Sequence, residues 1–381
     1  MKSKLFGIFA VSLLSFTACS SDSDDTNLTP QPEELTTLVG SINTSQSLKA
    51  GTVTLEGATI VREGAVLTIP AGTTIVAKDK GSYLLVERGA KIIAVGTSEK
   101  PITFTSNDKT SGAWGGLIIN GRAPLSRANI TDPSTFGTEI NDQIQYGGDD
   151  VADNSGVLDY VILEYTGSNI SDDKEHNGLT LNGVGNGTKI SNIFILSSAD
   201  DAIEFFGGSV DVTNLLAVDS EDDMFDFTQG YTGTLTNAYG IWTANFSTNE
   251  ADPRGVEADG NHDGNGSNHI NQSNFKMQDI TIVQNSKTPG VAGTMQDVIK
   301  VRRGATASTT NLLVKVGENS LVGDMIDFTD GKGVGSATIS YTLLPAELTA
   351  KINPADASGI IRNTTSTGAN TSVFAWTKFS F

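Results

Sequence analysis

The chain has 381 residues, a formal net charge of −19 at pH 7 and a single cysteine. The negative charge argues against nucleic acid and anionic membrane surfaces as direct partners, because both repel an acidic protein. One cysteine cannot form an internal disulfide, so the stability of the fold must come from a packed core.

The N-terminal segment has the pattern of a secretion signal. Lys2 and Lys4 precede an apolar run from Leu5 to Phe16, which is too short to span a membrane. Cys19 follows two small residues and resembles the lipidated cysteine of a lipoprotein. We therefore expect a lipoprotein signal peptide over residues 1–18, with acylation of Cys19. The alternative is a signal peptide that is cleaved elsewhere.

Residues 19–47 are rich in Ser, Thr, Asp and Pro and have no periodic apolar pattern. This composition predicts that the lipidated Cys19 is followed by a flexible acidic tether. The acidic run from Ser20 to Asp25 resembles the signal that sends Bacteroidota lipoproteins to the cell surface; an ordinary solvated linker is the alternative. The predicted localisation is the outer membrane, lipid-anchored and exposed at the cell surface.

The rest of the chain, residues 48–381, contains a seven-residue phrase that returns six times. Apolar and polar residues alternate within each copy, which is the pattern of a strand with one buried face. A strand that returns along the chain is typical of a solenoid, in which each coil buries its face against the next. The copies begin at Asn177, Asp201, Asp223, Arg254, Asp297 and Asp324.

A second phrase, an Asn or Asp before a run of apolar residues, repeats in step with the first. From Asn192 to Asn214 is 22 residues, which is too short for a coil that contains a helix. Asn side chains at the same turn of successive coils can pair along the solenoid axis. The positions are Asp159, Asn192, Asn214, Asn237, Asp279 and Asn311.

These Asn ladders, inward apolar stacks and short coils resemble the right-handed parallel β-helix of the pectate-lyase-like superfamily. The resemblance covers roughly residues 50–360. It implies an all-β fold: a single-stranded right-handed parallel β-helix solenoid. The segments Gly112–Asn120 and Glu204–Gly208 also resemble a group of Bacteroidota surface lipoproteins.

Insertions interrupt the coils at a consistent place. The step from the Asn or Asp turn to the next phrase lengthens after Asp159, Asn237, Asp279 and Asn311. We therefore expect loop insertions on one edge of a single face. Further insertions span residues 121–156 and 260–274. The aromatic segment Phe374–Phe381 is expected to cap the open C-terminal end, where a strand edge would otherwise be unpaired.

The outward residues of the phrase form columns along the axis. The central column contains Thr180, Glu204, Asp226, Glu257, Lys300 and Asp327. Neighbouring strands lie about 4.8 Å apart, where two carboxylates repel by about 3.5 kcal/mol at an effective dielectric constant of 20. A Ca²⁺ ion bound by Glu204, Asp226 and Glu257 could offset this repulsion. A salt-bridged ladder with Arg254, Lys300 and Arg302 is the alternative.

One loop has the spacing of a calcium-binding loop. Oxygen-bearing side chains recur at alternate positions, with Gly264 at the sixth, as in an EF-hand. Position 12 is Ile270 instead of Glu, so a distant carboxylate would have to complete the site. The candidate ligands are Asp259, Asn261, Asp263, Asn265 and Ser267. The alternative is a surface turn rich in Gly and Asn.

The function favoured by these features is non-catalytic. We expect a cell-surface lipoprotein that acts as a binding or accessory module for a glycan or an outer-membrane protein complex, with Ca²⁺ as the candidate cofactor. The candidate ligand-stacking residues are Phe206, Tyr231, Tyr239 and Trp242. The alternative is that these aromatic side chains pack beneath the insertions.

An enzymatic function, as a polysaccharide lyase or glycoside hydrolase, is the competing hypothesis. A lyase needs a base beside a neutralised uronate, and a hydrolase needs two carboxyl groups. The candidate catalytic residues are Lys300, Arg302, Arg254, Asp226 and Glu257. Against this hypothesis, an acidic face repels an acidic glycan unless a metal bridges them, and no lyase motif is recognisable. A purely structural or adhesive rod is a third, less favoured function.

Overall fold

The computed structural model describes residues 34–171, 174–262 and 266–381. Residues 34–381 form one compact unit. The signal peptide predicted over residues 1–18 and the lipidation site at Cys19 lie outside the described residues. Within the described ranges, no helix is both long enough and apolar enough to cross a membrane.

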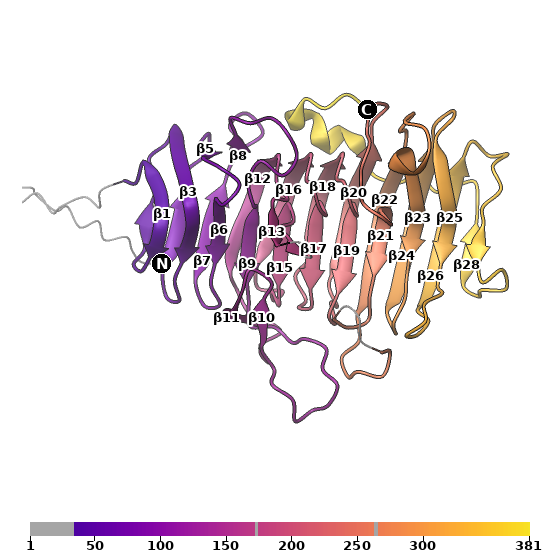
Figure 1. Ribbon diagram of the computed structural model, residues 1–381, viewed down its shortest axis with the longest axis horizontal. Coiled ribbons are helices and arrows are strands. Elements are labelled where there is room, and N and C mark those ends of the chain that lie inside the picture. The colour runs from indigo at the N-terminus through magenta and orange to yellow at the C-terminus, as the bar shows by residue number, and fades with distance from the viewer. Residues whose placement is uncertain (1–33, 172–173, 263–265) are drawn as a thin grey trace, which may run out of the picture. The chain divides into compact units, whose positions relative to one another are not determined.

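Twenty-four strands join into one parallel sheet that winds into a right-handed β-helix, which confirms the predicted fold (Figure 1). Its strands are β1 Thr37–Ile42, β2 Gln46–Ser47, β3 Thr52–Val61, β4 Val66–Ile69, β5 Thr74–Ala77, β6 Tyr83–Val86, β7 Lys91–Val95, β8 Ile102–Ser106, β9 Leu117–Asn120, β12 Gly156–Glu164, β15 Leu179–Asn182, β16 Lys189–Leu196, β17 Ile203–Phe206, β18 Val212–Val218, β19 Phe225–Thr228, β20 Thr234–Trp242, β21 Arg254–Ala258, β22 Asn274–Gln284, β23 Thr294–Lys300, β24 Thr306–Val316, β25 Leu321–Asp327, β26 Ser336–Leu344, β27 Ile352–Asn353 and β28 Ile360–Arg362. The insertions carry two antiparallel pairs, β10 Phe136–Thr138 with β11 Asn141–Tyr146, and β13 Asn169–Ser171 with β14 Lys174–Glu175.

Each complete coil has three sides, because one long strand bends and a short strand follows it. In β16 the bend falls at Asn192, whose φ of 53° lies in the left-handed region that Asn tolerates better than most residues. The short strand β17 supplies the third side. The same bend recurs at Asn214, Asn237, Asp279 and Asn311. The Asn or Asp phrase in the sequence therefore marks one corner of the solenoid.

Side-chain amides pair along this corner, as predicted. Asn214 Nδ2 donates to Asn192 Oδ1 at 2.9 Å, and Asn237 Nδ2 donates to Asn214 Oδ1 at 2.9 Å. The prediction for Asp159 was shifted by one residue: Tyr160, with a φ of 52°, holds the corner. Asp159 nevertheless extends the ladder, because its Oδ1 accepts from Asn192 Nδ2 at 2.7 Å.

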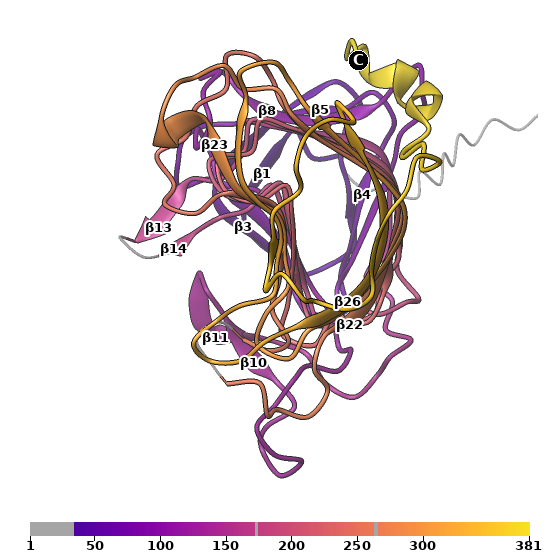
Figure 2. The ribbon, with the colours of Figure 1, turned by 90° about the vertical axis from the view of Figure 1, so that its right-hand side faces the viewer.

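The alternating apolar residues of the phrase fill the interior of the tube, whose ribbon Figure 2 shows from the end. Phe205 and Phe227, on adjacent coils, stack with ring centroids 5.0 Å apart, and Phe275 continues the stack at 4.1 Å from Phe227. All three side chains are fully buried. The period-two pattern is thus explained by a core that is shared between successive coils.

The β-helix begins before residue 48, which corrects the expected tether boundary. Strand β1 pairs in parallel with β3, and Leu38 and Leu48 are both fully buried. Residues 37–47 therefore belong to the first coil. Their short strands contain only a few apolar residues among many polar ones, so they resemble a linker in composition.

The C-terminal segment does not cap the open end, which corrects a second expectation. The 3-10 helix η2, Thr371–Thr377, lies along the outside of β16, β18 and β20 (Figure 1). Phe374 is fully buried there against Leu216 and Tyr239. These bent strands carry outward-facing apolar residues that need a cover, and the returning C-terminal segment provides it.

The insertions flank the face formed by the short strands β15, β17, β19, β21, β23 and β25. Insertions at the predicted turn leave from one edge and include the β13–β14 hairpin and the 3-10 helix η1, Val291–Gly293. Those at residues 121–155 and 259–273 leave from the opposite edge, where β10 and β11 lie (Figure 2). The expectation that the insertions lie on one edge is therefore wrong, because the face is walled on two sides.

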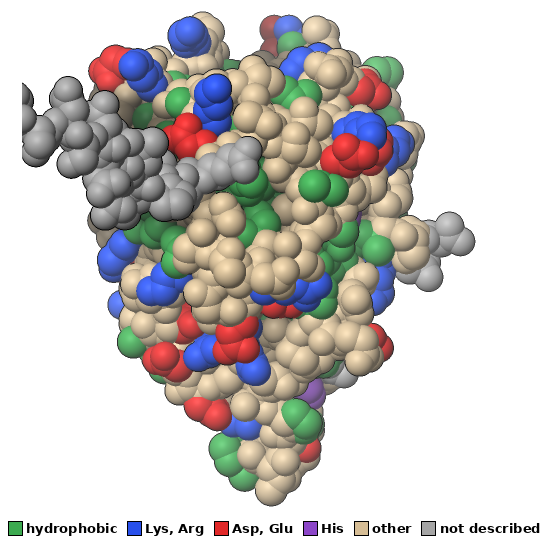
Figure 3. All heavy atoms as spheres, turned by 90° about the vertical axis from the view of Figure 1, so that its left-hand side faces the viewer, with side chains coloured by type: hydrophobic (Ala, Val, Ile, Leu, Met, Phe, Trp, Pro, Cys, Tyr) green, Lys and Arg blue, Asp and Glu red, His purple; other side chains and the backbone are tan. Residues whose placement is uncertain are grey.

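At the N-terminal end of the solenoid, basic and acidic side chains lie next to one another (Figure 3). In the first coils Lys78 Nζ lies 2.5 Å from Glu56 Oε1, and Arg62 Nη1 lies 2.6 Å from Glu87 Oε1. Positive and negative charges thus balance locally at this end of the molecule.

Candidate functional site

The outward columns predicted from the repeat are present on the walled face. Parallel pairing places Glu204 opposite Asp226, and Asp226 opposite Glu257. Further along the axis, Lys300 lies opposite Asp327. Because the strands are in register, acidic and basic residues of different coils lie one above another on the same surface.

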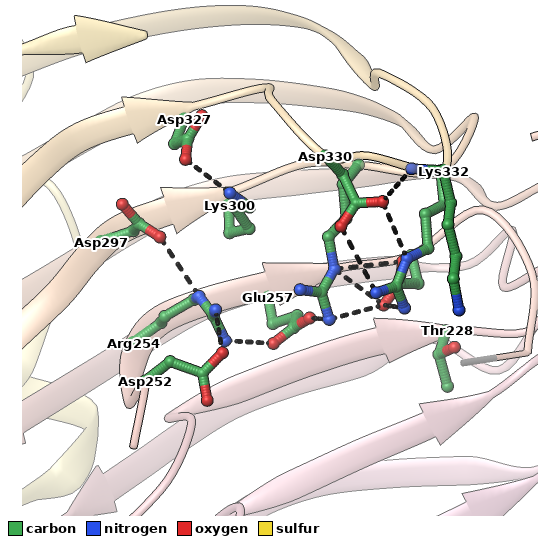
Figure 4. A network of polar contacts seen from close by, with 12 residues as sticks. Thr228, Asp252, Arg254, Glu257, Asp297, Lys300, Asp327, Asp330 and Lys332 are labelled. Atoms are coloured by element: carbon green, nitrogen blue, oxygen red, sulfur yellow. Dashed lines mark hydrogen bonds and ion pairs between the residues drawn. The ribbon is translucent and has the colours of Figure 1, made fainter. Parts of the chain in front are cut away.

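The C-terminal half of the face is neutralised by internal ion pairs (Figure 4). Arg254, which is 4% exposed, contacts Glu257, and its Nε lies 3.2 Å from Asp297 Oδ2. Lys300 Nζ lies 2.5 Å from Asp327 Oδ2. The other pairs of the network are Arg254–Asp252, Arg302–Glu257, Arg302–Asp259, Arg303–Asp259 and Arg303–Asp330. The salt-bridged ladder considered from the sequence is therefore correct for these coils.

The ion pairs weaken the case for a basic catalyst. Burial acts to lower the pKa of Arg254, but Asp223 and Asp252 outweigh it and raise the pKa above its usual range. Burial, together with Arg303, lowers the pKa of Arg302, whose guanidinium is held between two carboxylates. A guanidinium or ammonium group held in this way is poorly placed to take a proton from a substrate.

The N-terminal half of the face holds a dense group of carboxyl groups from β17, β19 and the turns before them. Oxygens of Asp201, Glu204 and Asp226 lie within 4.8 Å of one another, and so do those of Asp200, Asp201 and Asp222. Asp223 Oδ1 has no hydrogen-bond partner although the residue is only 2% exposed, and Asp222 Oδ1 and Asp226 Oδ1 are also buried and unpartnered. We call these six residues, Asp200, Asp201, Glu204, Asp222, Asp223 and Asp226, the carboxylate cluster.

A few hydrogen bonds hold the cluster in place. Asp201 Oδ1 accepts from the backbone N–H of Asp223 at 2.9 Å, and Glu204 Oε2 accepts from Asn177 Nδ2 at 2.6 Å. Asp222 Oδ1, Asp223 Oδ1 and Asp226 Oδ1 remain buried without a donor. Buried charge of this kind must be neutralised, by protons or by a cation.

The pKa shifts reflect that requirement. Burial, followed by repulsion from neighbouring carboxylates, raises the pKa of Asp200, Asp201, Glu204 and Asp223 well above the ordinary range. Burial also raises the pKa of Asp226 to about 7, although Arg302 opposes the shift. For Asp222, burial and then Glu250 raise the pKa to about 7. Asp222 and Asp226 therefore exchange protons with the solvent near neutral pH.

A groove of about 360 Å³ opens onto the carboxylate cluster. Of the fifteen described residues that line it, ten are Asp or Glu, so negative charge is concentrated in the groove. Glu175 and Glu250, from the insertions on one edge, form one wall, and Glu139 and His262, from those on the other edge, form the opposite wall. The groove thus combines a rigid floor of strands with walls from four insertions.

The cluster fits a divalent cation in its donor chemistry. Ca²⁺ takes several carboxylate oxygens, and Asp201, Glu204 and Asp226 bring three carboxyl groups together. Asp226 Oδ1 is buried there without a hydrogen-bond partner. Of the three predicted ligands of the outward column, Glu204 and Asp226 do lie next to each other. Glu257 differs, because it contacts Arg254 and Arg302 instead of joining the group.

The predicted calcium-binding loop has less support. Asp259 pairs with Arg302 and Arg303, and Asn261 Nδ2 donates to the backbone carbonyls of Gly266 and Arg303 at 2.8 and 3.0 Å. Ser267 is exposed. Asp263 and Asn265 lie outside the described residues. The described members of this loop thus serve the ion-pair network and the turn itself.

The predicted aromatic platform is not available to a ligand. Tyr231 and Trp242 are fully buried, and Tyr239 is 4% exposed beneath the C-terminal segment. Phe206 lines the groove but is only 5% exposed, because Tyr146 from an insertion packs on it. The alternative interpretation is correct for Phe206, which an insertion covers, and for Tyr239, which the C-terminal segment covers. Tyr231 and Trp242 instead belong to the interior core, where the Tyr231 ring lies 4.4 Å from the Phe205 ring.

Several groove residues escaped the sequence analysis. Asp200 and Asp222 were missed, although the Asp-Asp pairs at 200–201 and 222–223 recur with the 22-residue spacing of the coil. That recurrence is a signal that could have found them. Glu139, Glu175 and Glu250 come from insertions outside the repeat, so their approach to the groove depends on how each loop folds.

Comparisons with known proteins agree with this architecture. The profile of the pectate-lyase-like β-helix domain matches residues 40–378. No curated protein matches the chain. Tailspike protein 2 of a bacteriophage of Escherichia coli O157:H7 shares 10% identity at a TM-score of 0.36, over 82% of this chain and 42% of the tailspike. The enzymatically active domain of bacteriophage CBA120 tailspike protein 2 shares 10% identity at a TM-score of 0.34, over 82% of this chain and 48% of that domain.

The chain thus spans less than half the length of either of these two matched chains. The profile match is of a different kind, because it extends over nearly the whole described β-helix. On that match, and on the parallel three-sided coils described above, the chain belongs to the pectate-lyase-like β-helix domain family.

Proposed function

We propose that the groove binds a neutral glycan. In this proposal a Ca²⁺ ion held by Asp201, Glu204 and Asp226 takes part in the binding. The observation that carries the proposal is the carboxylate cluster, whose buried oxygens have too few donors from the protein. Ca²⁺ would neutralise these oxygens and leave coordination positions for ligand hydroxyl groups.

The chemistry of the groove favours a neutral glycan. Sugar hydroxyl groups are hydrogen-bond donors, and the lining residues that surround them are mainly carboxylate acceptors. A polyuronate would meet repulsion from the ten acidic lining residues. The concave floor between two walls suits a narrow chain-like ligand better than a flat protein surface.

The proposal also includes a place in the cell, at the surface of the outer membrane. Acylation at Cys19 would hold the β-helix at the outer membrane, with the groove exposed at the cell surface to capture glycans there. A second role, as an accessory subunit of an outer-membrane protein complex, is compatible with that setting. Purification of the lipidated protein in mild detergent tests it, because a stoichiometric partner would support the accessory role.

The direct test measures cation and glycan binding by isothermal titration calorimetry. We expect the purified β-helix to bind CaCl₂, and to bind neutral manno-, xylo-, cello- or galacto-oligosaccharides more tightly with Ca²⁺ than with EDTA. Asp226→Asn should weaken Ca²⁺ binding at least tenfold. Asp142→Asn, which removes an exposed carboxylate from the β10–β11 insertion, should leave binding unchanged. Absence of Ca²⁺ binding, or glycan binding insensitive to EDTA, would refute the role of the ion.

Hydrolysis of the bound glycan is a second candidate function. Glu204 and Asp226 bring two carboxyl groups together in the groove, and a hydrolase needs two carboxyl groups. The release of reducing ends from the same oligosaccharides would support hydrolysis. Activity that persists in EDTA and disappears in Glu204→Gln would assign the carboxyl pair to catalysis instead of metal binding.

A further inference from the structure

A second cavity of about 330 Å³ lies beside the groove, between two insertions of different coils. One wall comes from the insertion after β9 and includes Leu125 and Phe136; the other comes from the insertion after β21 and includes His269. His262 lines both the groove and the cavity. The two spaces therefore adjoin at this histidine.

The cavity walls are joined by backbone hydrogen bonds. Arg127 and Ile270 form an antiparallel bridge, with N···O distances of 3.2 Å from Arg127 N and 2.8 Å from Ile270 N. Arg127 Nη1 also donates to the carbonyl of Asp132 at 3.1 Å. These hydrogen bonds link the insertion after β9 to the insertion after β21. The cavity is therefore a structured part of the fold.

Phe136 presents an aromatic ring to this cavity. The residue is 43% exposed, which is unusual in a chain whose other aromatic side chains near the groove are buried. Its ring lies 4.6 Å from the His262 ring and 6.1 Å from the Tyr146 ring, which it meets edge to face. These neighbours fix the orientation of Phe136 and leave much of its surface open to solvent.

Tyr146 connects this ring to the floor of the groove. It is 2% exposed, donates to Gln229 Oε1 at 2.5 Å and packs edge to face on Phe206, which lines the groove. Gln229 itself lines the cavity. A rigid aromatic row therefore runs from the floor of the carboxylate groove to the exposed ring of Phe136.

We propose that Phe136 forms a separate sugar-binding subsite, in which the apolar face of a pyranose ring stacks on the phenyl ring. This inference rests on the proposed glycan binding and deepens it. One sugar unit binds over the carboxylate cluster, and the glycan continues past His262 so that a later unit reaches Phe136. Sugar C–H groups are apolar, and a held aromatic ring offers them a contact surface at little entropic cost.

The subsite makes affinity depend on glycan length. Oligosaccharides that occupy only the carboxylate groove do not reach Phe136, so its loss does not affect them. Longer oligosaccharides gain the stacking contact. The polar neighbours of the cavity, Ser126, Thr135 and Gln229, provide hydrogen-bonding groups around the ring.

The test titrates neutral manno-, xylo-, cello- and galacto-oligosaccharides of two to six units into wild-type protein, Phe136→Ala, Phe136→Trp and Ile130→Ala. Ile130 is 73% exposed on the same insertion, and it does not line the cavity, so Ile130→Ala is the matched control. Circular dichroism and thermal melting confirm that each variant is folded.

We expect Phe136→Ala to weaken binding of the longest oligosaccharide about tenfold, in line with a typical aromatic stacking contact, and to leave the disaccharide unchanged. Phe136→Trp should retain or improve the binding of the longest oligosaccharide, and Ile130→Ala should match the wild type. Equal affinities for wild type and Phe136→Ala at every length would overturn the subsite while leaving the groove function intact. A wild type that binds none of the oligosaccharides would overturn both.

Discussion

Glu204 and Asp226 face each other on the adjacent parallel strands β17 and β19, and their carboxyl oxygens lie within 4.8 Å. Burial raises the pKa of both groups. The strand register fixes their backbone positions, since β17 and β19 are each hydrogen-bonded to strands on both sides. Electrostatic repulsion is thus built into the face, and its relief by protons or Ca²⁺ can be measured.

The pH dependence of stability follows from this pair and its neighbours. In the folded protein the pKa of Asp222 and of Asp226 is about 7, above the usual value for Asp. The folded state therefore holds more protons than the unfolded state, and it loses stability as rising pH removes them. Without Ca²⁺, we expect the melting temperature to fall by several degrees between pH 6.5 and 8.5.

This window avoids a contribution of opposite sign. Burial lowers the pKa of His176 to about 4, so its effect on stability is confined to pH values below about 6.5. Thermal melting in EDTA at pH 6.5, 7.5 and 8.5 checks the prediction, with Asp226→Asn as the variant that should flatten the curve. A melting temperature that rises with pH over this range would contradict it.

Removal of Arg254 should destabilise the protein strongly. Its guanidinium is buried between Glu257 and Asp297. Arg254→Met would leave Asp297 without its main counter-charge and would leave Glu257 paired with Arg302 alone. Loss of one partner of a buried ion pair typically costs about 3–5 kcal/mol. Chemical denaturation should show this loss.

The control uses an exposed pair. Arg122 and Glu63 form an ion pair whose side chains are 44% and 69% exposed, so Arg122→Gln should cost less than about 1 kcal/mol. If Arg254→Met were as mild as Arg122→Gln, the buried network would not support the C-terminal coils. Adding Asp297→Asn to Arg254→Met should recover part of the lost stability.

Two substitutions at the asparagine corner should separate the backbone and side-chain contributions to stability. Asn214 bonds to Asn192 and Asn237 and has a φ of 60°. Asn214→Gly loses the two hydrogen bonds but accepts the left-handed backbone, for a cost of about 1–2 kcal/mol. Asn214→Ala also strains the backbone, so about 1 kcal/mol more is expected. Denaturation midpoints that ranked Ala above Gly in stability would contradict this account.

The docking of the C-terminal segment should depend on Phe374. This side chain is fully buried in the outer apolar cluster, and Phe374→Ala typically costs about 3–5 kcal/mol at such a position. We expect residues 363–381 to become sensitive to protease and to exchange amide hydrogens faster, while the coils remain folded. Ile361→Ala, at a position 60% exposed, is the control and should change neither measurement. Unchanged protection in Phe374→Ala would show that hydrogen bonds alone, such as the one that Asn370 N donates to the side-chain Oδ1 of Asn237 at 2.6 Å, hold the segment.

The repeat made much of the site predictable. Because side chains alternate along a strand and parallel strands pair in register, the sequence spacing alone placed Glu204 beside Asp226 and Lys300 beside Asp327. The same reasoning could not predict that Glu257 forms an ion pair with Arg254. Arg254 lies three residues away along the same strand, and its length allows it to reach across the column.

The sequence by itself determined the β-helix, its asparagine corner, its apolar interior and the register of its outward columns, because each is a local pattern repeated along one axis. The tertiary structure alone decided where the non-repeating segments lie. It brought Glu139, Glu175 and Glu250 to the groove, buried Tyr231 and Trp242, and left Phe136 exposed. Segments that do not repeat have no neighbouring copy to fix their register, so their positions follow from packing against surfaces that the coils must first create.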